Sequence, residues 1–142
     1  MPDTHLARDL HIEHEQIDQQ HEHLANIIGK IYHAMQMQAP HATTLELFQQ
    51  LITSTQEHFA YEENLLRQSD YPDLDGHLEE HNELLHQLEG LRQRLRSGSL
   101  EINMHMMILL KDWLLNHVDD ADRAYVSHLK AKFSDTLSTR GE

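Results

Sequence analysis

The sequence predicts an all-α fold, an antiparallel up-down-up-down four-helix bundle, on two observations. Apolar residues recur at alternating steps of three and four along four segments of the 142-residue chain, which is the pattern of a helix face in a bundle. Short breaks separate these segments, and loops this short make successive helices antiparallel neighbours. We expect helices at about residues 15–37, 43–69, 73–96 and 100–132, within a single domain that covers residues 1–142.

Each predicted helix carries histidine inside the stripe that should face the core. The third stripe is the most regular, because leucine recurs along it on both sides of two histidines. The four stripes consist of Ile17, His21, Leu24, Ile28, Ile31 and Met35; of Leu51, Thr55, His58, Glu62 and Leu65; of Leu74, His77, His81, Leu84, Leu88, Leu91 and Leu95; and of Ile102, Met106, Leu109, Trp113, His117, Ala121, Ala124 and His128.

Capping and breaking residues mark the ends of the helices. Thr43, with Glu46 three residues later, resembles a capping box and predicts the start of the second helix. Pro72 disfavours helix in the residue before it, which separates the second helix from the third. Gly98 fits the C-terminal cap of the third helix, and Ser99 fits the N-cap of the fourth.

Composition excludes several classes of partner and site. A net charge of −13 argues against nucleic acid and against an anionic membrane surface. The absence of cysteine excludes disulfides and thiolate metal sites. No apolar run approaches the roughly 20 residues of a membrane span, and no secretory signal is evident, so we expect a cytoplasmic protein. Residues 1–14 are expected to form a polar arm and residues 134–142 a frayed tail.

Histidines and a carboxylate on the buried stripes predict a metal centre in the core of the bundle. His58 and Glu62 are four residues apart, as are His77 and His81, and this spacing places each pair on one face of its helix. A buried charge without a partner is unfavourable by roughly several kcal/mol, and a metal ion supplies the partner. Imidazole and carboxylate suit iron, manganese and zinc. The candidate ligands are His21, His58, Glu62, His77, His81 and His117.

A carboxylate near the end of the fourth stripe could complete this set. Spacing alone leaves Asp119, Asp120 and Asp122 open. Asp122 follows His117 by five residues, about 140° around an ideal helix, whereas Asp120 lies nearer to the face of His117.

The other histidines are expected to have structural or surface roles. His128 lies on the fourth stripe, roughly three turns beyond His117, and is expected at the end of the bundle. Trp113 and Phe59 are expected to pack. The histidines expected at the surface are His5, His11, His14, His23, His33, His41, His86 and His105.

The order and spacing of the candidate ligands resemble the hemerythrin family, and within it the bacterial branch, the bacteriohemerythrins. The resemblance covers about residues 15–133. These proteins often carry a tryptophan upstream of the first helix, and residues 1–16 contain none. The matching motifs are Ile17-Asp18-Gln19-Gln20-His21-Glu22-His23-Leu24, His58-Phe59-Ala60-Tyr61-Glu62-Glu63, Tyr71-Pro72 followed by His77-x3-His81, and Trp113-Leu114-Leu115-Asn116-His117-x4-Asp122.

The resemblance implies Asp122 as the seventh ligand and a pair of iron ions as the metal. It also implies reversible O2 binding, for storage, delivery or sensing, at the iron that keeps an open coordination position. The implied division gives His77, His81 and His117 to one iron, His21 and His58 to the open iron, and Glu62 and Asp122 to both as bridges, along with an oxo or hydroxo group.

Two other functions stay open at this point. The same di-iron centre could serve an enzyme that handles peroxide or nitric oxide, or the protein could bind iron without gas chemistry. Ferritin-like di-iron oxidases carry two Glu-x-x-His motifs, whereas this chain has one match, from Glu83 to His86. No general acid or nucleophile is evident near the stripes, so we expect O2 binding rather than catalysis.

Overall fold

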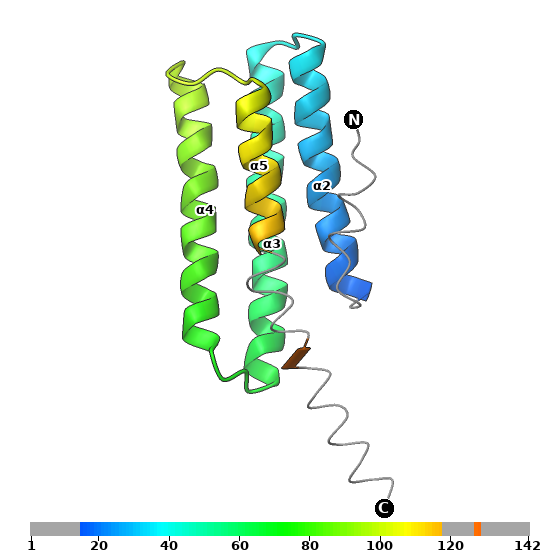
Figure 1. Cartoon of the computed structure of the whole chain (residues 1–142), viewed down its shortest axis with the longest axis vertical. Coiled ribbons are helices and arrows are strands. Elements are labelled where there is room, and N and C mark those ends of the chain that lie inside the picture. Colours follow the sequence, from blue (N-terminus) through cyan, green and yellow to red (C-terminus); the bar gives the residue numbers. More distant parts are fainter. Residues whose placement is uncertain (1–14, 118–126, 129–142) are drawn as a thin grey trace, which may run out of the picture.

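Four helices form an antiparallel bundle in the computed structural model, which describes residues 15–117 and 127–128. The chain runs up and down alternately through the four (Figure 1). Helix α2 contacts α3 and α5, and α3 also contacts α4. The described residues contain no strand. The predicted fold class is therefore confirmed. The helices are α2 (Glu15–Gln36), α3 (His41–Gln68), α4 (Leu74–Ser97) and α5 (Met104–His117).

An apolar core runs along the bundle axis and holds the helices together. In the first three predicted stripes, every residue is buried or half-buried. Burial of a large aliphatic or aromatic side chain stabilises the fold by roughly 1.5–3 kcal/mol. The largest fully buried side chains are Phe48, Phe59, Ile17, Leu24, Ile28, Ile31, Leu51, Leu66, Leu88 and Leu95.

The fourth stripe was predicted one residue out of phase at its centre. Leu109 is 45% exposed, whereas Leu110 is fully buried, together with Met106 and Trp113. Steps of three and four residues connect Met106 to Trp113 through either leucine, so the spacing does not choose between them. The buried face of α5 consists of Met106, Met107, Leu110, Trp113 and Leu114. Leu110 lies in the middle of this face and is therefore the leucine that packs into the core. The stripe members Ala121 and Ala124 lie outside the described residues.

The predicted capping box at the start of the second helix is wrong. Helix α3 begins at His41, two residues before Thr43, and its N-cap is Pro40 without a side-chain hydrogen bond. The Pro40 carbonyl accepts the N–H of Thr43 at 2.9 Å. Proline supplies the extended backbone of an N-cap residue (φ −55°, ψ 145°), so the helix starts before the threonine.

The predicted N-cap of the fourth helix is also wrong, although the cap of the third is confirmed. Gly98 ends α4 with a left-handed φ of 80°. The Ser99 hydroxyl donates back to the Arg94 carbonyl at 3.3 Å and so belongs to the end of α4. Helix α5 begins at Met104 rather than near residue 100, and the Asn103 side chain accepts the N–H of Met106 at 3.0 Å.

Hydrogen bonds hold Trp113, which was expected to pack, and His128, which was expected at the end of the bundle. The indole N–H of Trp113 on α5 donates to the Leu84 carbonyl of α4 at 3.2 Å. His128 donates through Nε2 to the Ser69 carbonyl at 3.3 Å, which places it beside the end of α3. None of the helices in the described ranges is long and apolar enough to cross a membrane.

Candidate metal centre

Six predicted ligands from four helices meet in the interior of the bundle. Helix α2 contributes one histidine, α3 one histidine and one glutamate, α4 two histidines and α5 one histidine. Each of the six is at most 3% exposed. Their ligand atoms form two groups in which every atom lies within 4.8 Å of the others. These groups are His21, His58, Glu62 and His117, and Glu62, His77 and His81.

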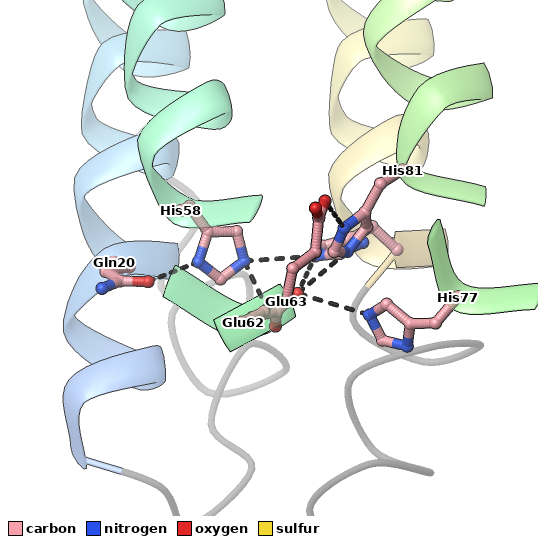
Figure 2. Close-up of polar contacts among 7 residues, drawn as sticks. Gln20, His58, Glu62, Glu63, His77 and His81 are labelled. Carbon is pink, nitrogen blue, oxygen red and sulfur yellow. Dashed lines mark hydrogen bonds and ion pairs between the residues drawn. The ribbon is translucent and has the colours of Figure 1, made fainter. Parts of the chain in front are cut away.

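The Glu62 carboxylate belongs to both groups and lies between them (Figure 2). Its Oε1 atom lies 3.0 Å from His81 Nε2 and 3.5 Å from His77 Nε2. Its Oε2 atom lies 3.4 Å from His58 Nε2. The two oxygens of one carboxylate therefore face imidazoles from different helices, which is the geometry that a carboxylate bridge between two cations requires.

His117 belongs to the group of His21 and His58 rather than to that of the α4 histidines. Its Nε2 atom is 3.2 Å from His58 Nε2 and 3.7 Å from Glu62 Oε1. The resemblance assigned His117 to the same ion as the two histidines of α4, whereas the ligand atoms group it with His58 and His21. His117 and the two α4 histidines nevertheless lie near the same oxygen, Glu62 Oε1.

His81 is held in place on both its edge and its face. Its Nδ1–H donates to Glu63 Oε2 at 3.0 Å, which leaves Nε2 aimed at Glu62. Phe59 stacks on the imidazole with ring centroids 3.8 Å apart and an interplanar angle of 2°. Burial raises the pKa of the Glu63 carboxyl, and the nearby Arg67 opposes this shift.

His58 is oriented in the same way by an amide. Its Nδ1–H donates to Gln20 Oε1 at 2.5 Å, so Nε2 again points inward (Figure 2). Gln20 lies on α2, on the far side of the His58 ring from Glu62. The two orienting residues thus differ in charge, since one is a carboxylate and the other is a neutral amide.

The donor set fits a divalent metal. Neutral imidazole and carboxylate are suitable ligands for iron, manganese and zinc. Hydrogen bonds to the outer nitrogen of a ligating histidine fix the tautomer that presents the other nitrogen to the metal, and the contacts of His58 and His81 do this. Asp122, the remaining predicted ligand, lies outside the described residues, as do Asp119 and Asp120.

Sequence reasoning missed the residues that surround the ligands. Gln20 and Glu63 each adjoin a predicted ligand in sequence but lie off the stripe, so periodicity gives no signal for them. Their cue is chemical, because a ligating histidine needs an acceptor for its outer nitrogen. Asp18 was missed too. It is only 6% exposed and lies three residues before His21, on the same side of α2.

Tyr71 lies beside the cluster, at the turn between α3 and α4. Its ring makes an edge contact with His77 at a centroid distance of 6.0 Å and another with His128 at 5.2 Å. Burial and the nearby Asp73 and Glu80 raise the pKa of its hydroxyl. The surface histidines in the described ranges, His23, His33, His41, His86 and His105, are exposed as predicted, and His5, His11 and His14 lie outside those ranges.

Comparisons with known proteins point to one family. The model of the hemerythrin HHE cation binding domain matches residues 13–129. A bacteriohemerythrin of Stenotrophomonas maltophilia is 30% identical over 123 residues, which cover 87% of this chain and 79% of the relative. A bacteriohemerythrin of Pseudomonas aeruginosa is 28% identical over 94% of this chain and 86% of the relative. A myohemerythrin of Sipunculus nudus is 37% identical over 57% of this chain and 62% of its own length.

Solved structures give the same fold. A crystal structure of wild-type hemerythrin superposes with a TM-score of 0.70 at 25% identity, over 78% of this chain and 85% of the other. A mutant hemerythrin structure gives a TM-score of 0.71 at 23% identity. The four-helix fold, the buried histidine and glutamate cluster and the family match together show that this chain belongs to the hemerythrin family.

Proposed function

We propose that this protein binds two iron ions in the buried cluster and binds O2 there reversibly. The observation that carries the proposal is the position of Glu62, whose Oε2 faces His58 of α3 and whose Oε1 faces the two histidines of α4. The proposed ligands are His21, His58, Glu62, His77, His81 and His117, with Asp122 as a second bridge. A pair of ferrous ions would supply the electrons that hold O2 reversibly.

The residues around the cluster favour reversible binding over further reaction. Phe59 lies against three of the imidazoles, at centroid distances of 5.7 Å from His58, 3.8 Å from His81 and 4.9 Å from His117. The buried Phe59 ring is apolar and offers no proton. Glu63 and Gln20 both face the outer nitrogens of the ligands, so neither is directed at the space between the groups.

An anaerobic-to-aerobic optical titration, combined with metal analysis, tests the proposal. We expect two iron ions per chain and an absorption band that appears with O2 and disappears when O2 is removed. A protein with two irons but no reversible band would instead be an iron-binding protein. Peroxide turnover well above that of free iron would support the enzyme alternative.

Removal of one ligand tests the assignment of the site. In His77→Ala, we expect lower iron content and lower thermal stability together, because metal binding is coupled to folding. His86→Ala is the matched control, since His86 is an exposed histidine on the same helix. Full iron content and an unchanged spectrum in His77→Ala would contradict the assignment.

A further inference from the structure

The two halves of the cluster have unequal surroundings. On the α4 side, the outer nitrogen of His81 donates to the Glu63 carboxylate at 3.0 Å. On the α2 side, the outer nitrogen of His58 donates to the Gln20 amide at 2.5 Å. A carboxylate acceptor makes an imidazole a stronger donor to a metal than a neutral acceptor does, because a negative charge stabilises the positive charge that the ring acquires.

The surroundings of His58 and His81 also differ in whether a pocket adjoins the imidazole. A pocket of about 250 Å³ lies between α2 and α3, and His58 and Gln20 line it along with Gln16, Gln19, His23, Ser54 and Glu57. The imidazole of His81, in contrast, is covered on one face by Phe59. The outer edge of the His58 imidazole therefore adjoins this pocket.

We propose that Glu63 and Gln20 are positioning residues that make the two metal positions unequal, with tighter binding and slower exchange on the His77/His81 side. This inference rests on the proposed function, since it requires two metals in the cluster. Glu63 strengthens the His81 side, and Gln20 leaves the His58 side weaker and exchangeable. The open position that the proposed function needs lies on this weaker side.

Iron extraction provides the test. The protein is loaded anaerobically with Fe²⁺ and then mixed with a chromogenic ferrous chelator, and the release of iron is followed over time. We expect two phases of equal amplitude whose rates differ by at least about tenfold, since partners of metal ligands typically change affinity by about 10–100-fold.

Substitution of the two orienting residues, Glu63 and Gln20, shows which metal position each phase of iron release comes from. Glu63→Gln should accelerate the slow phase by about tenfold and leave the fast phase, whereas Gln20→Glu should slow the fast phase by a similar factor. Gln19→Glu is the matched control, because it adds the same charge at an exposed position one residue away that lines the same pocket, and it should change neither rate. The helical circular dichroism of each metal-free variant shows whether it has folded, and Glu63→Asp, which restores the carboxylate, should recover part of the slow phase if Glu63→Gln folds poorly.

The outcomes separate this inference from the proposed function. Two irons released at a single rate that neither Glu63→Gln nor Gln20→Glu changes would overturn the inference and leave the proposed function standing. An equal effect of Gln19→Glu and Gln20→Glu would also overturn it, because the charge alone would then explain the result. Failure of the wild-type protein to bind iron at all would contradict the proposed function itself.

Discussion

The Glu62 side chain determines whether the interior of this bundle can hold positive charge. It is fully buried, and its oxygens lie 3.0–3.7 Å from the Nε2 atoms of four histidines on three helices. A metal pair would be bound by both its oxygens. The same residue would then influence both metals, whereas each imidazole would bind only one.

Replacement of Glu62 by glutamine keeps the volume of the side chain and removes its charge. We expect Glu62→Gln to weaken both metals, by more than the roughly 10–100-fold that replacement of a ligand's outer partner causes, because a direct ligand is lost. Metal analysis after dialysis against a chelator measures this. Glu46→Gln, at an exposed position of α3, is the control and should retain two metals. Retention of both metals in Glu62→Gln would show that Glu62 does not bridge.

Asp122 allows a separate test at the residue scale. The family resemblance favours Asp122 as the second bridge, whereas ideal helical spacing favours Asp120, nearer to the face of His117. Asp122→Ala should release one or both metals and remove the absorption band of the oxygenated form. Asp119→Ala and Asp120→Ala should keep both metals. Metal loss in Asp120→Ala alone would assign the bridge to Asp120 instead.

At the scale of elements, the face that each of the four helices buries determines which residues become ligands. Each ligand falls on a buried stripe, so periodicity places all six described ligands at the core without knowledge of the fold. The same pattern fails at Leu109, because two leucines satisfy the spacing and only packing against neighbouring helices distinguishes them. Gln20 and Glu63 could not be found in this way, since their partners come from other positions along the chain.

Helix ends were predicted less well because a capping residue is defined by local backbone geometry. Serine, threonine and asparagine are all good N-caps, and Ser99 was predicted from its place directly after Gly98, with no knowledge of where the loop turns. In the structure, the Ser99 hydroxyl is engaged with the end of α4, and Asn103 caps the first turn of α5. The orientation of α5 matters for function, because this helix carries His117 into the cluster.

The cap of α5 can be measured directly. Asn103→Ala should lower the free energy of unfolding by about 1 kcal/mol, since it leaves the N–H of Met106 without its side-chain acceptor. Ser99→Ala should change it by less than about 0.5 kcal/mol, as is usual for an exposed site. Urea denaturation of the metal-free proteins gives both values. A larger decrease in the free energy of unfolding in Ser99→Ala than in Asn103→Ala would show that Ser99 is the N-cap.

For the whole molecule, the metal centre joins all four helices at one place in the core. The ligands come from α2, α3, α4 and α5, so metal bound by them would hold these elements together. A site formed by folding is absent from the unfolded chain, and the free energy of metal binding therefore adds to the stability of the fold. The net charge of −13 favours the approach of cations to the molecule.

Removal of the metal should therefore lower the thermal stability, and more at neutral than at acid pH. At a free metal concentration about 100-fold above the dissociation constant, the stabilisation is about 2.7 kcal/mol, which corresponds to roughly 5–10 °C in Tm for a chain of this size.

Metal binding requires neutral imidazoles and an ionised carboxylate, so protons compete with the metal as the pH falls. The difference in Tm between loaded and chelator-treated protein should thus shrink from about pH 8 to about pH 5. Calorimetry of both forms across this range measures it, with His77→Ala expected to show a smaller difference throughout. Coincident melting curves at neutral pH, or a difference that grows toward acid pH, would show that the metal does not hold the bundle together.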